Sequence, residues 1–138
     1  MNINEELITA IMKGDTNKVK ELVESGADVN ARADNSHTAL QIAYIYRKHA
    51  NNWLEILDYL LEKKADINAQ DNLGTTVMMM AVMNNEPLFV EYFIKKGADP
   101  NIKDQFGFTA FTLAKKNYED IIKLLKSESY ENLILSAF

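Results

Sequence analysis

The chain of 138 residues has no cysteine, which excludes a disulfide framework, a thiolate metal site and a cysteine nucleophile. It has only two histidines, His37 and His49, and neither stands among further ligands at the spacing of a metal site. The sequence also lacks H-E-x-x-H, G-x-S-x-G, a Walker loop and G-x-G-x-x-G. These absences predict a protein that is not an enzyme and that holds no metal or cofactor.

Positive charge is scarce, because 15 Lys+Arg stand against 20 Asp+Glu and give a net charge of −5. Such a chain has little attraction for phosphate backbones or anionic membranes, so we expect neither as a partner. No apolar run approaches the roughly 20 residues that span a bilayer, and the N-terminus lacks the pattern of a signal peptide. We expect a soluble, cytoplasmic and monomeric protein.

An internal repeat runs through most of the chain. When similar stretches of the chain are aligned, four positions carry the same residue in each stretch, and we call each such position a column. Successive alanines of one column are 33, 38 and 33 residues apart. The columns hold Asp28, Asp66 and Asp99; Asn30, Asn68 and Asn101; Thr38, Thr76 and Thr109; and Ala10, Ala43, Ala81 and Ala114. A period of this length is typical of stacked structural repeats.

The unit from residue 76 to residue 107 shows what each repeat builds. Thr76 can cap a short apolar helix, Pro87 can begin a second helix, and Gly97 can end it. The apolar positions that we expect in the second helix are Leu88, Phe89, Phe93 and Ile94. A turn-rich segment follows, so the unit is helix, loop, helix and protruding turn. Helices this short bury their apolar stripes only by stacking, which predicts an α-helical solenoid.

These columns resemble the ankyrin repeat family, which has 33-residue units with a T-P-L-H-x-A signature. The resemblance rests on the segments at residues 26–30, 65–68 and 97–101 and on the G-x-T triplets at 74–76 and 107–109. It implies an all-α solenoid of about four helix-loop-helix repeats with protruding turn or β-hairpin fingers. The single domain, 1–138, would divide into repeats 1–34, 35–71, 72–104 and 105–126 and a C-terminal capping helix, 127–138.

The family signature is altered at several positions. Gln41, Met79 and Thr112 stand where the family has histidine; we expect Gln41 and Thr112 to hydrogen-bond locally and Met79 not to. The proline of the signature is replaced by Ala39, Val77 and Ala110.

Other features mark individual repeats. The second repeat is five residues longer, and we expect the extra residues to loop out of the stacked core between Tyr44 and Trp53, with Trp53 in a packing role. Lys64 stands where the other units have glycine, which predicts a mildly strained helix end. We expect Met78 in the core and Met83 at the surface.

The resemblance implies a protein-interaction module that binds through a concave face formed by the turns and the first helices. The turn residues in these columns are Asp34, Asn35, His37, Asn72, Leu73, Thr75, Gln105, Phe106 and Phe108. The residues from the first helices are Ile45, Tyr46, Met83, Asn84 and Lys116. Aromatic residues and methionine are enriched in interface cores, which favours Phe106 as an anchor. Phe108 suits packing against a neighbouring turn equally well.

Other classes of function stay open. The chain could be a self-assembling structural subunit that buries its apolar turns against another copy. It could also be a regulatory or inhibitory domain acting on an enzyme or toxin. A small-molecule site would need a deep pocket, which thin repeats rarely form.

Overall fold

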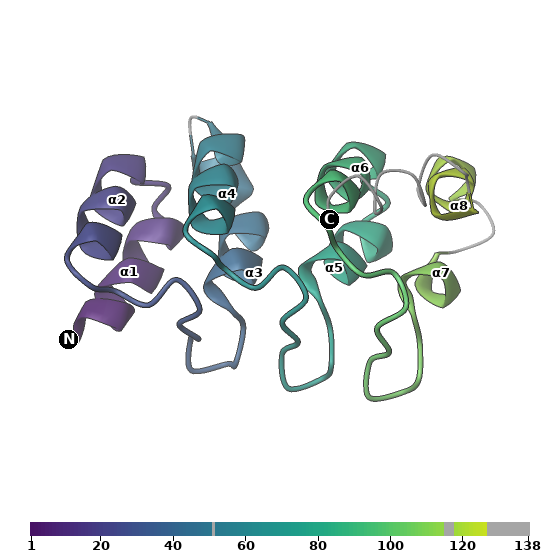
Figure 1. Cartoon of the computed structure of the whole chain (residues 1–138), viewed down its shortest axis with the longest axis horizontal. Helices are drawn as coiled ribbons and strands as arrows, with labels where there is room; N and C mark the ends of the chain where they lie inside the picture. Colours follow the sequence, from purple (N-terminus) through teal and green to yellow (C-terminus); the bar gives the residue numbers. More distant parts are fainter. Residues whose placement is uncertain (51, 115–117, 127–138) are drawn as a thin grey trace. The chain divides into compact units, whose positions relative to one another are not determined.

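The computed structural model describes residues 1–50, 52–114 and 118–126 (Figure 1), except that the side chain of Trp53 lies outside this part. The chain divides into two units, unit 1 at Met1–Asp66 and unit 2 at Ile67–Phe138. Within the described part the regular structure is helical, and the β pairing is a single isolated bridge between Arg32 and Thr38. The prediction of a mostly helical chain without an extensive sheet is therefore confirmed.

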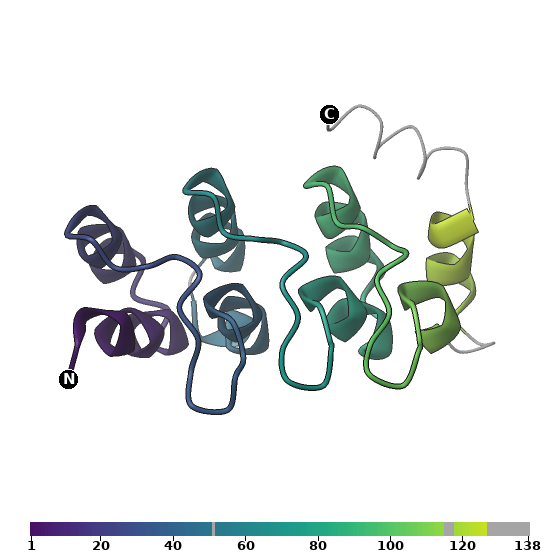
Figure 2. The same cartoon turned by 60° about the horizontal axis from the view of Figure 1, so that its bottom comes forward.

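Unit 1 contains two helix pairs. The helices are α1 (Ile3–Met12), α2 (Thr16–Glu24), α3 (Ala39–Ile45), the 3-10 turn η1 (Arg47–His49) and α4 (Trp53–Glu62). Helix α1 packs against α2 and α3, while α4 packs against α3 and α2. Figure 2 shows α1 and α3 in one layer of the unit and α2 and α4 in the other. The core between them contains fully buried aliphatic side chains, among them Leu7, Ile11, Val19, Leu57 and Leu60.

Unit 2 repeats this arrangement. Its helices are α5 (Val77–Met83), α6 (Pro87–Lys95), α7 (Ala110–Leu113) and α8 (Glu119–Lys126). Helices α5 and α6 pack together, α7 packs on α5, and α8 packs on α6 and α7. Its core includes Met78, Met79, Phe93, Ile94 and Ile121.

A threonine begins the first helix of three repeats, as predicted, because its hydroxyl accepts from the third residue of the helix; these are Thr38, Thr76 and Thr109. In two of these caps a side chain of the helix also accepts the N–H of the capping threonine: Gln41 accepts from Thr38 at 2.9 Å, and Thr112 accepts from Thr109 at 2.6 Å. The prediction that Met79 makes no local hydrogen bond is wrong. Its sulfur lies 3.5 Å from the N–H of Thr76 and acts as a weak acceptor there.

Helix α6 begins at Pro87, as predicted, but Leu88 is not part of its buried stripe. The side chain of Leu88 is 79% exposed, whereas Phe89, Val90, Phe93 and Ile94 are buried. At 3.6 residues per turn the buried positions occupy one side of α6 and Leu88 points to the opposite side. Its inclusion in the apolar face was therefore wrong.

The aspartate and asparagine columns have a structural role that sequence reasoning did not assign. The side-chain oxygen of an asparagine in one repeat accepts the N–H of the aspartate in the following repeat, at 2.8 Å in both cases. The pairs are Asn30 with Asp66 in unit 1 and Asn68 with Asp99 in unit 2, while Asp28 of the first repeat donates instead to Asn4 of α1, also at 2.8 Å. The two bonds between column residues join the turns of successive repeats and explain why both columns recur.

The extra residues of the second repeat lie against the turn between α1 and α2. His49 is exposed, and its ring nitrogen Nδ1 is 3.3 Å from the carbonyl oxygen of Met12. A Cβ at Gly14 would lie 2.6 Å from the carbonyl oxygen of His49, and Gly14 has a φ of 69°. This turn therefore requires glycine for two reasons, its backbone conformation and the close approach of the inserted segment.

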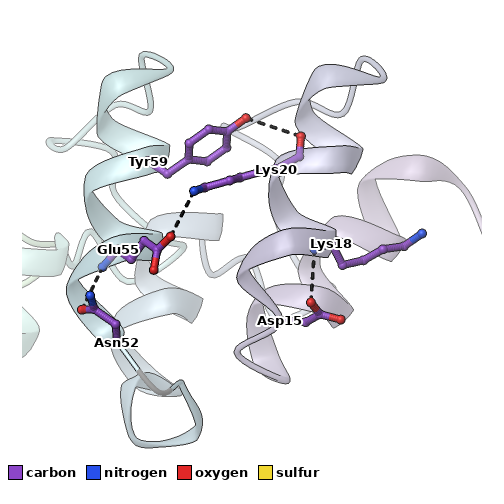
Figure 3. Close-up of polar contacts among 6 residues, drawn as sticks. All are labelled: Asp15, Lys18, Lys20, Asn52, Glu55 and Tyr59. Carbon is purple, nitrogen blue, oxygen red and sulfur yellow. Dashed lines mark hydrogen bonds and ion pairs between the residues drawn. The ribbon is translucent and has the colours of Figure 1, made fainter.

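Polar contacts join α2 and α4 on the outer layer of unit 1 (Figure 3). The ammonium group of Lys20 forms an ion pair with Glu55 at 3.0 Å, and the hydroxyl of Tyr59 donates to the carbonyl of Lys20 at 3.4 Å. Asp15 and Asn52 cap the two helices. Burial raises the pKa of the Tyr59 hydroxyl, and the negative charge of Glu24 raises it further.

Candidate functional site

The finger at residues 104–108 is a tight turn folded around one carboxylate. The N–H of Asp104 donates to the carbonyl of Phe108 at 2.8 Å. One carboxylate oxygen of Asp104 accepts the N–H groups of both Phe106 and Phe108, each at 2.9 Å. Gly107 completes the turn with a φ of 83°. The backbone therefore holds two phenylalanines in a defined turn at the surface.

The finger at residues 71–75 has the same construction. A carboxylate oxygen of Asp71 accepts the N–H groups of Leu73 and Thr75 at 3.0 Å. Asp71 itself is buried, so its carboxylate forms part of the finger's interior. Both fingers of unit 2 thus use an aspartate to fix the backbone of the residues that follow it.

The two fingers of unit 2 lie side by side. The N–H of Gln105 donates to the carbonyl of Leu73 at 2.9 Å. The side-chain amide of Gln70 donates to the carbonyls of Gly74 and Lys103, both at 2.8 Å. A Cβ at Gly74 would lie 2.7 Å from the backbone nitrogen of Gln105. Leu73 and Phe106 are therefore carried on directly adjacent backbones.

Four of the predicted partner-binding residues in unit 2 are large, apolar and exposed. The exposed fractions are 67% for Phe106, 49% for Leu73, 48% for Phe108 and 43% for Met83. The rings of Phe106 and Phe108 contact each other, with centroids 6.4 Å apart. Met83 is the last residue of α5, and its exposure, like the burial of Met78, is as predicted. We call Leu73, Phe106 and Phe108 the finger patch.

The remaining predicted residues of unit 2 are polar. Asn72, Asn84 and Gln105 are exposed and Thr75 is half-buried. They can supply hydrogen bonds around the finger patch, although the geometry assigns none of them to a ligand. Lys116 and the predicted capping helix at 127–138 lie outside the described residues.

In unit 1 the predicted residues Asn35, His37 and Tyr46 line one groove with a volume of about 500 Å³, together with Asp34 and Ile45. Sequence reasoning missed the wall that α1 contributes. That wall consists of Glu5, Ile8, Thr9 and Met12. The alignment of Ala10 with Ala43 already indicated a first helix from Glu5 to Met12, so extending the binding columns to that helix would have identified this wall.

The finger of unit 1 differs chemically from those of unit 2. Ala33 stands where the others have aspartate, and its N–H donates to the carbonyl of His37 at 2.9 Å. Asn35 accepts the N–H of His37 through its side chain at 3.2 Å, and Ser36 has a φ of 67° in place of glycine. This finger presents polar side chains, so the two units offer different surfaces.

Within the described part of the chain, no group of three or more histidine, cysteine, aspartate or glutamate residues could hold a metal ion. None of the helices at residues 1–50, 52–114 and 118–126 is long and apolar enough to cross a bilayer.

Comparison with known proteins identifies relatives that differ widely in size. The chain is 27% identical over 85 residues to YahD of Escherichia coli (strain K12), named as an ankyrin repeat protein, covering 62% of this chain and 40% of YahD. It is 31% identical over 70 residues to serine/threonine-protein kinase 12 of Arabidopsis thaliana, covering 51% and 14%. It is 35% identical over 87 residues to the transient receptor potential cation channel subfamily V member 5 of Rattus norvegicus, covering 57% and 12%.

The chain therefore spans less than half the length of each of these relatives. The family model for ankyrin repeats (3 copies) matches residues 4–71 and 48–134, which together cover nearly the whole chain. The fold is thus an all-α repeat solenoid, and the chain belongs to the ankyrin repeat family.

Proposed function

We propose that this protein is a non-enzymatic interaction module that binds an apolar segment of a protein partner through the finger patch. Ankyrin repeats are generally protein–protein interaction modules, and they are typically not enzymes. The observation that carries the proposal is the backbone bond between Gln105 and Leu73, because it brings together two fingers whose apolar side chains, Leu73 and Phe106, are both exposed. Adjacent exposed apolar side chains on a soluble domain mark interaction sites.

The construction of the fingers favours tight binding at low entropic cost. Asp71 and Asp104 fix the backbone beneath Leu73 and the two phenylalanines, so less conformational freedom is lost when a partner binds. Phenylalanine buries a large area on contact, and such anchors carry much of the binding free energy of an interface. Met83, at the end of α5, can add an adaptable apolar contact.

The test is a capture experiment with immobilised protein and lysate of the native cell, read by quantitative mass spectrometry. We expect a partner that the parent chain retains and the double variant Leu73→Ala/Phe106→Ala loses. Leu88→Ala is the matched control, because Leu88 is even more exposed but lies on α6 outside the fingers. A partner lost equally with Leu88→Ala, or retained by the double variant, would contradict the proposal.

A second candidate is self-assembly, which the apolar finger patch also allows. Sedimentation equilibrium separates the two: a monomer at high concentration supports binding of a different protein, whereas a dimer abolished by Phe106→Ala supports self-assembly. A regulatory or inhibitory action on an enzyme or toxin would use the same patch and would appear when the captured partner is assayed for activity. Monomeric state and cytoplasmic location stay predictions.

A further inference from the structure

The groove of unit 1 has three distinct walls. One is a single face of α1, because Glu5, Ile8, Thr9 and Met12 follow the i, i+3, i+4, i+7 spacing. The second comes from α3 and the residue after it, namely Ile42, Ile45 and Tyr46. The third is the finger from Arg32 to His37. A helix of ten residues is about 15 Å long, so the groove can hold more than one side chain of an extended segment.

The chemistry changes along the groove. Glu5 is in the first turn of α1 and stands in the repeat column of Thr38, where the finger enters α3. Asp34 is on that finger, so both carboxylates belong to the finger end. Met12 and Ile45 are the last residues of α1 and α3, which makes the opposite end apolar. The groove therefore combines an acidic end with an apolar end.

The two carboxylates are available to a ligand. Among the described residues neither Glu5 nor Asp34 forms an ion pair, and Glu5 accepts only one side-chain hydrogen bond, from Asn2 at 3.1 Å. Arg32 also lines the groove, but its guanidinium donates to the carbonyl of Ser36 at 3.0 Å and so is held by its own finger. With two carboxylates and one guanidinium, the groove has an excess of negative charge, as the whole chain does.

We propose that this groove takes a lysine or arginine side chain of a protein partner, next to an aliphatic residue of the same segment. The stem of such a side chain is apolar and its head is charged, which matches a groove that is apolar at one end and acidic at the other. Ile8 and Ile45 contact the apolar parts, and Glu5 and Asp34 attract the charged head. The inference rests on the proposed function, since it names the partner chemistry that unit 1 recognises.

The test uses nuclear magnetic resonance titration of the isotope-labelled full chain with three capped pentapeptides that differ only at the centre: Gly-Leu-Lys-Leu-Gly, Gly-Leu-Met-Leu-Gly and Gly-Leu-Glu-Leu-Gly. We expect the lysine peptide to shift the amide signals of Ile8, Met12, Asn35 and Ile45 and to saturate. The other two should bind at least about fivefold more weakly, which is the size of one partly exposed charge interaction. Added salt should reduce the preference.

Two variants localise the effect. Glu5→Gln/Asp34→Asn should lower the affinity for the lysine peptide to that for the methionine peptide. Asp34→Lys alone should do so too, and because Asp34 is exposed on a finger this variant tests the proposal even if the double variant is less stable. Equal affinities for the lysine and glutamate peptides would overturn the proposal. So would the absence of a saturable shift up to a peptide concentration of about 10 mM, because a dissociation constant of that size corresponds to only about 3 kcal/mol of binding free energy.

Phe106→Ala separates this inference from the proposed function. It lies in unit 2 and should leave the lysine-peptide affinity unchanged. If the peptide binds normally but no partner depends on Leu73 and Phe106, the proposed use of the finger patch fails while the groove inference stands. If the partner depends on the finger patch and the lysine peptide shows no preference, the groove inference fails alone.

Discussion

The backbone N–H of Gln105 donates to the carbonyl oxygen of Leu73 at 2.9 Å. The two residues are 32 positions apart in the sequence. Their bond joins the finger that carries Leu73 to the finger that carries Phe106 and Phe108. A substitution that loosens the backbone of either finger should therefore affect the presentation of both.

Phe106→Ala should weaken partner binding by roughly 2 kcal/mol or more, because a large anchor side chain is lost. The fold should barely change, since Phe106 is 67% exposed. Thermal melting beside partner affinity measures both effects. A melting temperature lowered by many degrees with affinity preserved would identify Phe106 as a packing residue.

Asp104→Ala should loosen the finger, because the N–H groups of Phe106 and Phe108 lose their shared acceptor. We expect a cost of about 1 kcal/mol in unfolding free energy and faster hydrogen exchange at both amides. Asp104→Asn is the matched control, since its amide oxygen can accept the same bonds. If both variants behave alike, the charge of Asp104 matters rather than its geometry.

Lys64→Gly should raise the unfolding free energy by about 1 kcal/mol, partly offset by the greater freedom of glycine in the unfolded chain. Lys64 has a φ of 76°, while glycine occupies the equivalent positions Gly26 and Gly97 at 106° and 91°. Denaturant titration measures the change. A clear loss of stability would mean that the Lys64 side chain makes a contact worth more than the strain.

Gly14→Ala should destabilise unit 1 by about 2 kcal/mol or more, because it adds a steric clash with His49 to the strain of a positive φ. Gly107→Ala is the control, since Gly107 has a similar φ of 83° but open space around its Cβ position. The difference between the two variants in urea unfolding reports the close approach of the inserted segment. Equal costs would show that this segment moves away freely.

Tyr59→Phe should cost about 0.5 kcal/mol at neutral pH, because the hydroxyl's bond to Lys20 is long at 3.4 Å. Burial raises the pKa of Tyr59 in the folded state, so the folded chain keeps the proton where the unfolded chain releases it. The contribution of the protonated Tyr59 hydroxyl to the free energy of unfolding is complete below about pH 10, and it is lost as the pH rises through the folded-state pKa. The stability gap between parent and variant should therefore close at alkaline pH; a gap that widens would contradict the shift.

The amino-acid sequence by itself determined the repeat period, the threonine caps, the helix start at Pro87 and the strained helix end at Lys64. These depend on residues within a few positions of each other, so the local pattern is sufficient. It also identified Phe106 and Leu73 as members of one repeat column. The fingers that carry these two residues are neighbours in the structure.

Only the tertiary structure decided how segments about 30 residues apart meet. The direction of Leu88 depends on which side of α6 faces α5, and the role of Asn68 depends on the N–H of Asp99 in the next turn. The unit 1 groove likewise needs α1, α3 and a finger together. Such contacts leave no local periodicity, because the free energy that selects them comes from packing and hydrogen bonding between repeats rather than within one.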